Sequence, residues 1–557
     1  MRALKILTSH FFNRFFQNET IPFKEAAVAK VVSLLSILAV LSGALAYWEN
    51  LKYIVAPLLF PYVAGMKETS WKENFMFLSF SMIIMGLISL IEWDEIFVKK
   101  HDLSNLSLLP IKGITIFTSK ALSLAGFVGL FTFSMIIFSS PIFGLGRAKA
   151  YGNSIGLFLK ISFAHGVSVF ASNLFVFLFI MCLSGLLILL MGERKAEKLS
   201  VYFQAVAIVL FLSFFGIFDK LYSEVSLSNV NKLPISLFPP MWFTGLYEEL
   251  VGINGEAFYK LFFKGVVAIV FLMLIFIFEY FLLYQKQTRA ISRKTIHTAP
   301  MMSKIESTLN GWFFTNPLQR AIFQFIKTVM GRSRKHRLVF SLYISVVAGI
   351  FSVKIARLLY SGSFHSVFLY QFIHLFSLAI VLGFRMVVDI PWFIRGNWVF
   401  KITENNEKQN YLKGIKKSFF VLYLFPGFLV LLTLYSLLWG FKLAFMESVY
   451  GLLSSLILLE LAFTKYKKIP FSCLTVPGKM NLHKFWFFYV LGIYVYTFIL
   501  GFIGKLASEK EIYFLLIYFL IWVLFVVIKR SSLKKNWELV YEESPEPVVM
   551  NLGLRDV

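Results

Sequence analysis

The strongest constraint on this chain is a series of long, nearly uncharged apolar runs. A helix needs roughly 20 apolar residues to cross the hydrocarbon core of a bilayer. Runs of that kind predict spans near 30–48, 74–93, 114–138, 161–191, 201–219, 261–285, 339–358, 365–388, 418–438, 443–463, 485–504 and 512–528. They are continuous rather than short and alternating, which favours helices over a β-barrel. The sequence therefore predicts an all-α polytopic membrane protein with about twelve transmembrane helices.

Composition agrees with this fold class and narrows the kind of protein. Hydrophobic residues make up 58% of the chain and charged residues 15%, whereas soluble domains are about 25% charged. The net charge of +25 is typical of Lys and Arg in cytoplasmic loops beside anionic lipid. No basic segment outside the spans is interleaved with base-stacking aromatic residues, so we expect no nucleic-acid partner. Cys182 and Cys473 offer neither a disulfide framework nor metal-ligand spacing.

The distribution of basic residues predicts the orientation. With the N-terminus inside, the cytoplasmic segments carry roughly three times as many Lys and Arg as the outer segments. The segment 286–338 is the most basic, and Glu306 is its one acidic residue. Both termini are therefore predicted to be cytoplasmic, in the cell membrane. Leu51–Met66 is interrupted by Pro57 and Pro61, and we interpret it as interfacial or re-entrant, since a further span would reverse the parity.

The spans divide into two halves of six around the basic segment. The predicted organisation is a first six-span unit (1–285), a cytoplasmic linker (286–338), a second six-span unit (339–528) and a cytoplasmic tail (529–557). Each half is predicted to be preceded by an amphipathic helix lying in the membrane interface.

The two amphipathic helices are predicted from residues that repeat at helical spacing. In the first half, the apolar stripe is Leu4, Leu7, Phe11 and Phe15. In the second half, a helix over Leu318–Met330 has its apolar stripe at Leu318, Ala321, Ile322, Phe325, Ile326, Val329 and Met330, with Gln319, Arg320, Gln324 and Lys327 away from it. Asn316 is expected to cap this helix, and Pro317 suits its first turn. The alternative is that both are ordinary cytoplasmic helices.

Two short motifs in the first half resemble a known family. After the second span, the acidic and basic segment Glu92–Leu103 is followed by a Leu-Pro-Ile segment at Leu109–Ile111 and by a lysine-bearing helix start, Thr115–Lys120. Between the fifth and sixth spans lies Phe238-Pro-Pro-Met-Trp. Both motifs, and six spans preceded by an interfacial helix, resemble the permease subunits of the ABC-2 type exporter superfamily.

The resemblance implies a function and two candidate sites. The chain would be the membrane-spanning permease of an ATP-driven exporter, moving an unidentified substrate such as an amphiphile. A loop would dock the ATPase subunit through Asp94, Lys99, Lys100, Asp102, Leu109, Pro110 and Lys112. An outer re-entrant segment would contain Pro239, Pro240, Trp242 and Tyr247. The second half departs from the pattern, because the loop at 507–511 is too short for re-entrant helices and the segment after Asp389 lacks a Leu-Pro pair.

The chain lacks a nucleotide-binding motif of its own. A phosphate-binding loop requires Gly, four residues and then Gly-Lys-Ser/Thr. The pairs Gly478-Lys479 and Gly504-Lys505 are followed by Met and Leu. We therefore expect no enzymatic activity and no cofactor in this chain, with ATP bound by a separate ABC ATPase subunit.

Ionisable residues within the spans are the remaining candidates, because a charge at membrane depth is costly. They are Glu279, Arg385, Glu447 and Glu460, together with Lys354 and Arg357, for which the simpler interpretation is snorkelling at the outer end of their helix. A functional interpretation is a proton relay or a substrate path, and the simpler one for Arg385 is an i, i+4 ion pair with Asp389. His165 and His374 are expected to be hydrogen-bonded structural residues.

Two other classes remain open. Repeated units and intramembrane charges also occur in secondary, ion-coupled transporters. A membrane-embedded enzyme acting on lipid-linked substrates would need His, Asp or Glu converging at the membrane surface, and the sequence has no such signature.

Overall fold

The computed structural model describes residues 2–15, 24–59, 71–97, 106, 111–151, 154–224, 230–231, 235–252, 255–290, 313–314, 316–361, 367–392, 408–464, 466, 468–472 and 482–533. Within these residues the chain is built from helices and contains no β-strand. Eleven of the described helical stretches are long and apolar enough to cross a membrane, and helix α18 (Leu482–Ala507) adds a shorter apolar stretch, Leu491–Ala507. The predicted all-α, polytopic membrane fold is confirmed.

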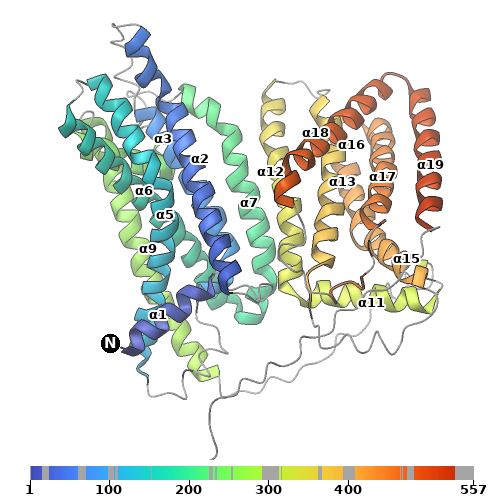
Figure 1. Ribbon diagram of the computed structural model, residues 1–557, viewed down its shortest axis with the longest axis horizontal. Helices are drawn as coiled ribbons and strands as arrows, with labels where there is room; N and C mark the ends of the chain where they lie inside the picture. The colour runs from blue at the N-terminus through green and yellow to red at the C-terminus, as the bar shows by residue number, and fades with distance from the viewer. Residues whose placement is uncertain are drawn as a thin grey trace, which may run out of the picture. The chain divides into compact units, whose positions relative to one another are not determined.

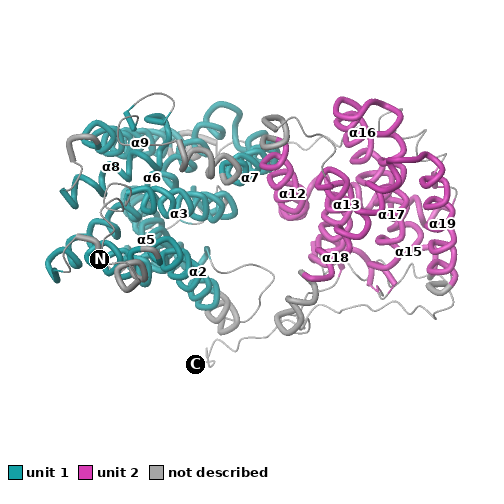
Figure 2. The backbone as a smooth tube through the Cα atoms, turned by 90° about the horizontal axis from the view of Figure 1, so that it is seen from above, with its two compact units in different colours: residues 1–297 teal, residues 298–557 magenta. Residues whose placement is uncertain are grey.

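The chain divides into two compact units, residues 1–297 and 298–557 (Figure 2). The division falls inside the basic segment 286–338. Each unit has buried hydrophobic clusters made only of its own residues.

Unit 1 contains six of the membrane-length stretches. Each stretch lies on its own long helix, and the two shorter α-helices of this unit have 13 residues each. The long helices alternate in direction along the chain (Figure 1). The described elements are α1 (Arg2–Arg14), α2 (Lys24–Leu59), α3 (Trp71–Ile91), η2 (Trp93–Glu95), α5 (Gly113–Tyr151), α6 (Ile155–Met191), α7 (Glu193–Glu224), η3 (Ile235–Leu237), α8 (Pro239–Val251) and α9 (Gly255–Ala290).

Helix α1 packs its predicted apolar stripe against α5. Phe11 and Phe15 are buried, and the ring of Phe15 lies 4.6 Å from that of Phe127. The Lys120 ammonium lies 5.2 Å and 4.9 Å from the ring centres of Phe11 and Phe15. Arg14 forms a 3.2 Å ion pair with Glu95, just after α3. The end of α3 and the beginning of α5 therefore share one end of unit 1 with α1.

Unit 2 contains five further membrane-length stretches and α18. Figure 1 shows α11 running across one end of this unit, at a steep angle to α12 and α17. The described elements are α11 (Pro317–Arg332), α12 (Arg334–Ser361), α13 (Val367–Val388), α15 (Lys408–Phe419), η5 (Phe420–Leu424), α16 (Phe425–Trp439), α17 (Phe441–Phe463), α18 and α19 (Glu511–Leu533).

Helix α11 has the predicted cap but a rotated buried face. The Asn316 side chain accepts a 2.8 Å hydrogen bond from the backbone N–H of Leu318, and Pro317 occupies the first turn. The buried residues are Gln319, Ile322, Phe323, Ile326, Val329 and Met330. The placement of Gln319 on the polar face, and of Ala321 on the buried one, is wrong. Helix α15 packs against that side, and Lys417 Nζ donates a 2.9 Å hydrogen bond to Gln319 Oε1.

A π-helical turn joins α15 to α16 without a loop. It spans Phe420–Leu424, and the N–H of Phe425 bonds to the carbonyl of Phe420, five residues earlier. Pro426 follows immediately. A proline inside an α-helix clashes with the carbonyl four residues before it. The wider turn relieves that clash and allows one helical path from Gln409 to Trp439.

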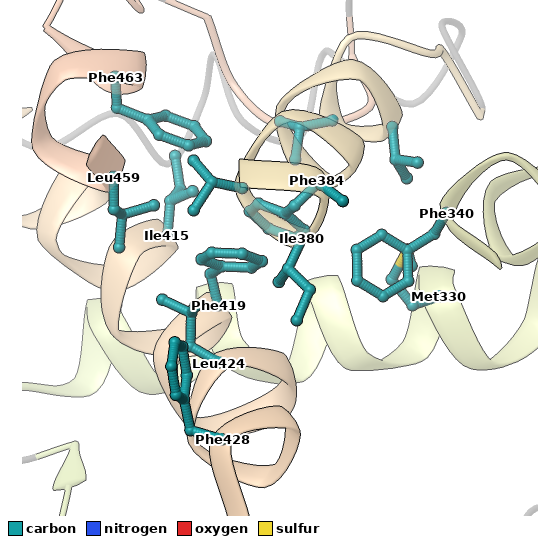
Figure 3. Close-up of a cluster of buried hydrophobic side chains, with 14 of the residues drawn as sticks. Met330, Phe340, Ile380, Phe384, Ile415, Phe419, Leu424, Phe428, Leu459 and Phe463 are labelled. Carbon is teal, nitrogen blue, oxygen red and sulfur yellow. The ribbon is translucent and has the colours of Figure 1, made fainter. Parts of the chain in front are cut away.

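The largest described core of unit 2 is aromatic and aliphatic (Figure 3). Phe384 of α13 stacks on Phe419 of α15, with ring centres 4.3 Å apart. Ile415, Leu459 and Phe463 surround this pair. The core joins α11, α13, α15 and α17, so the amphipathic helices are part of the folded unit.

Two further segments differ from the simplest sequence interpretation. Leu51–Leu59 continues α2, so these nine residues do not form a separate element. Residues 60–66 lie outside the described part, and the interfacial or re-entrant interpretation of Leu51–Met66 stays a prediction. The loop after α17 is folded back into unit 2 where it is described. Phe471 is buried, with a φ of 61°, and its backbone bonds to Val388 and Trp392 at 2.9 Å each.

Candidate functional site

The candidate site is a buried polar network beneath α8, in the half of unit 1 away from α1. Helix α8 has 13 residues, and at 1.5 Å per residue it is too short to cross a bilayer core of roughly 30 Å. It begins at Pro239 and ends at Gly252, which has a left-handed φ of 74° and donates its N–H to the carbonyl of Glu248 at 2.8 Å. A glycine suits that ending because it has no Cβ.

Helix α8 is held closely against its neighbours. At Gly245 an added Cβ would lie 2.6 Å from the backbone nitrogen of Phe262 in α9. The indole N–H of Trp242 donates a 2.9 Å hydrogen bond to the carbonyl of Ser236, and its ring lies edge-on to Phe175 of α6, with centres 5.6 Å apart. Eight of the 13 residues of α8 are buried. The helix is therefore a packed element of unit 1.

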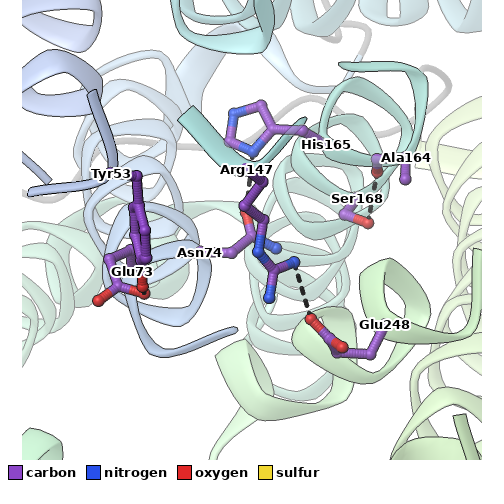
Figure 4. Close-up of polar contacts among 8 residues, drawn as sticks. All are labelled: Tyr53, Glu73, Asn74, Arg147, Ala164, His165, Ser168 and Glu248. Carbon is purple, nitrogen blue, oxygen red and sulfur yellow. Dashed lines mark hydrogen bonds and ion pairs between the residues drawn. The ribbon is translucent and has the colours of Figure 1, made fainter. Parts of the chain in front are cut away.

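The centre of the network is an ion pair between α5 and α8. Arg147 Nη1 lies 2.9 Å from Glu248 Oε1, and both side chains are fully buried (Figure 4). The guanidinium carbon of Arg147 also lies 4.9 Å from the ring centre of Tyr247. Attraction between two charges is strong in a low-dielectric interior, but each charge alone would be very costly there. Arg147 and Glu248 therefore hold α8 onto α5.

His165 of α6 connects this helix to α3 and α5 beside the ion pair. Its Nδ1 lies 2.8 Å from Asn74 Oδ1 in α3, and its Nε2 lies 3.1 Å from Ser139 Oγ in α5. Phe143 stacks on the imidazole, with ring centres 4.2 Å apart. The expected role of His165 as a hydrogen-bonded structural histidine is confirmed.

The network extends to α2 and deeper into the helix bundle. Tyr53 donates a 3.1 Å hydrogen bond to Glu73 Oε2, next to Asn74 (Figure 4). One helical turn or two further into the unit, Ser81 donates to Asn173 Oδ1 at 2.9 Å. Asn173 Nδ2 donates to Thr132 Oγ1 at 3.3 Å. Buried polar contacts thus link α2 to α3, α3 and α5 to α6, and α5 to α8.

This arrangement is suited to positioning and recognition. Among the described residues, no group of three or more His, Cys, Asp or Glu is placed to hold a metal ion. The ion pair gives α8 one favourable docked position. The Arg147 guanidinium is the buried cationic group of this arrangement, and a guanidinium pairs well with carboxylate and phosphate groups.

The residues predicted for the outer loop are the ones the structure brings together. Pro239, Pro240, Trp242 and Tyr247 all lie on α8, and Tyr247 lies edge-on to His165, with ring centres 6.4 Å apart. The predicted docking loop falls almost entirely outside the described residues. That applies to Lys99, Lys100, Asp102, Leu109 and Pro110, and to the side chain of Asp94. Lys112 is described and exposed, directly before α5.

Four of the intramembrane charges lie apart from this network. Arg385 pairs with Asp389 at i, i+4 as predicted, and Glu460 pairs with Lys416 of α15. Glu279 lies buried against Gly185 of α6. Glu447 is fully buried in α17.

Sequence analysis missed Arg147, Glu248, Asn74 and Glu73. The predicted third span ended at 138, which put Arg147 in a loop, whereas α5 continues to Tyr151. Pro141, Gly144 and Gly146 favour the end of a helix by sequence, but α5 continues through all three. Gly146 is where α5 approaches α2, since a Cβ there would lie 2.8 Å from Asn50 Oδ1.

No protein-family model, curated protein or solved structure matches this chain. The fold and site described above define the class: a multi-pass, all-helical membrane protein with a buried polar network in unit 1.

Proposed function

We propose that this chain is the membrane-spanning permease of an ATP-driven exporter of the ABC-2 type, with the ATPase on a separate subunit. The observation that carries the proposal is the order of elements in unit 1. Amphipathic α1 is followed by six membrane-length stretches, and the short buried α8 lies between the fifth and the sixth. That order resembles the half-transporter plan of the superfamily, including its folded-back segment.

In this proposal α8 acts as the gate. The Arg147–Glu248 ion pair holds it closed, and a substrate reaching the network displaces it. A substrate with an anionic head and an apolar body would be favoured, because the Arg147 guanidinium pairs with anions and the ring of Tyr247 lies beside it. The unit then alternates between a docked and an undocked α8.

The ATPase is proposed to dock on the segment 92–112, on the cytoplasmic side of the cell membrane. The ion pair between Arg14 and Glu95 supports this position, because it connects α1 to the start of that segment. A force on the segment would reach both α1 and the beginning of α5. The second unit has only Ser508–Lys510 between α18 and α19, so its part in the cycle differs.

Site-directed crosslinking tests the docking proposal. Cysteine is introduced for Lys112, which is exposed before α5, or for Ser154, which is exposed at the far end of α5 and α6. Both variants are made in a chain with Cys182 and Cys473 changed to serine. With an ABC ATPase encoded beside this gene co-expressed, Lys112→Cys is expected to crosslink and Ser154→Cys is not. Absence of co-purification, or equal crosslinking at both positions, would contradict the proposal.

A secondary, ion-coupled transporter is the second candidate. The observation that favours it is Glu447 of α17, an acidic side chain with no exposed surface. Transport that follows a proton gradient without ATP, and that stops in Glu447→Gln, would favour this candidate over the exporter.

A further inference from the structure

Unit 2 buries an acidic side chain whose oxygens are not satisfied by the protein. Glu447 of α17 has no exposed surface, and neither Oε1 nor Oε2 has a hydrogen-bond partner among the described residues. The other acid of α17 is different, because Glu460 is paired with Lys416. Buried polar groups are nearly always hydrogen-bonded, so an exception of this kind requires an explanation.

The surroundings of Glu447 are closely packed and consist of apolar and aromatic side chains. An added Cβ at Gly504 of α18 would lie 3.0 Å and 3.1 Å from the two carboxyl oxygens. The carboxyl group therefore lies directly against Gly504, at a position of α18 where any larger residue would contact it. Tyr450, Ala507 and Phe514 form the buried cluster beside it, with contributions from α17, α18 and α19.

The hydroxyl groups near Glu447 donate their protons elsewhere. Tyr370, Tyr435, Tyr450 and Tyr518 all lie within electrostatic range of the carboxyl. Tyr370 donates a hydrogen bond to Ser508 Oγ at 3.1 Å, and Tyr435 donates to the carbonyl of Leu369 at 2.7 Å. Tyr450 donates to the carbonyl of Leu500 at 3.1 Å, and Tyr518 donates to that of Met446 at 2.7 Å. These phenols come from α13, α16, α17 and α19.

Further titratable neighbours in this region are His374 of α13 and Tyr496 of α18, whose ring centres lie 6.3 Å apart. The ring centre of His374 lies 4.7 Å from that of Tyr450, and its Nδ1 lies 3.2 Å from Ser454 Oγ. None of these phenols donates a hydrogen bond to the carboxyl oxygens of Glu447, so no described donor stabilises a carboxylate there. The site therefore suits a neutral carboxylic acid better than a carboxylate.

We propose that Glu447 is a proton-binding site, protonated while α17 and α18 are packed together and deprotonated only when their separation admits water. An unpaired carboxylate in apolar surroundings is far less stable than the neutral acid. On separation, the O–H bond of the acid breaks and the proton passes to a water molecule, leaving a carboxylate that water can solvate. Proton release and the opening of the α17–α18 contact are thus one event. This goes beyond the proposed exporter function and does not depend on an ATPase.

Carbodiimide labelling of the full-length chain in lipid nanodiscs tests the proposal. Dicyclohexylcarbodiimide reacts with protonated carboxyl groups in apolar surroundings. Peptide mass spectrometry is expected to find an adduct on Glu447 at neutral pH, and the adduct should decrease as the pH rises. Glu447→Gln should lose this adduct, whereas Glu460→Gln, which removes the ion-paired acid of the same helix, should retain it.

Infrared difference spectroscopy of the unmodified chain provides a measurement that needs no variant. A carboxylic acid C=O band that disappears on alkaline titration supports the proposal. A carboxylate at Glu447 at neutral pH, shown by the absence of both adduct and band, would overturn it. Protection from labelling by Na⁺ or K⁺ at constant pH would also overturn it, because the site would then bind a metal cation.

Discussion

At the scale of single residues, the Arg147–Glu248 pair is the strongest constraint described in unit 1. Both side chains are fully buried, 2.9 Å apart. A buried pair of this kind contributes modestly when intact, because desolvation offsets the attraction. Loss of one partner has a much larger effect, because an uncompensated charge remains in the interior.

Single and double substitutions of this pair should therefore differ in a characteristic way. We expect Arg147→Met and Glu248→Gln each to lower the free energy of unfolding by about 3–5 kcal/mol. The double variant should be more stable than either single variant, because no charge is left alone. Thermal unfolding of the purified chain in detergent measures all three.

The Arg385–Asp389 pair is the matched control. Its side chains are 27% and 19% exposed, so solvent screens the interaction. Asp389→Asn should cost at most about 1 kcal/mol. Equal effects at the two pairs would show that burial of Arg147 and Glu248 is not what makes their interaction important.

At the scale of elements, the close approach of α8 to α9 determines where α8 and its Glu248 lie in unit 1. Gly245 allows it, because any side chain there would meet the backbone of Phe262. The backbone of a helix in a packed unit moves far less easily than a side chain does.

Gly245→Ala is expected to displace α8. Overpacking at such a site costs roughly 1–3 kcal/mol, and the displacement should also weaken the Arg147–Glu248 pair. Gly129→Ala in α5 is the control, because a Cβ there meets nothing within 4 Å and alanine is the better helix former. Hydrogen exchange of α8 should rise in the first variant only.

The rotated face of α11 gives a second test at this scale. Ile326 is fully buried whereas Ala321 is exposed. Ile326→Lys should strongly destabilise unit 2 by burying an unpaired charge, and Ala321→Lys should be tolerated. The melting temperature of the Ile326→Lys variant should be lower than that of the Ala321→Lys variant. The opposite order would contradict the buried face that the structure gives to α11.

At the scale of the whole molecule, the two units bury separate cores. Each described hydrophobic cluster contains residues of one unit and none of the other. Residues 1–297 and 298–557, expressed separately, should each insert into membranes and unfold cooperatively. Circular dichroism and size-exclusion chromatography in detergent measure this, and aggregation of both halves would contradict it.

The positions of the spans could be predicted from the sequence because apolar length decides membrane insertion locally. The same holds for the Asn316 cap and the Arg385–Asp389 pair, whose partners are within four residues of each other. Arg147 and Glu248 are far apart in the sequence, and only tertiary packing brings them together. The burial of Gln319 likewise depends on Lys417 of another helix. Local periodicity contains no information about such partners.

The π-helical turn at Phe420–Leu424 has a consequence for how unit 2 can change over evolution. One extra residue within a helix shifts the angular phase of everything after it. The polar, lysine-rich side of α15 and the lipid-facing side of α16 can therefore be oriented independently, although no loop separates them. Deleting one residue of the turn would rotate α16 by about 100° relative to α15, exchanging its lipid-facing surface for its packed one.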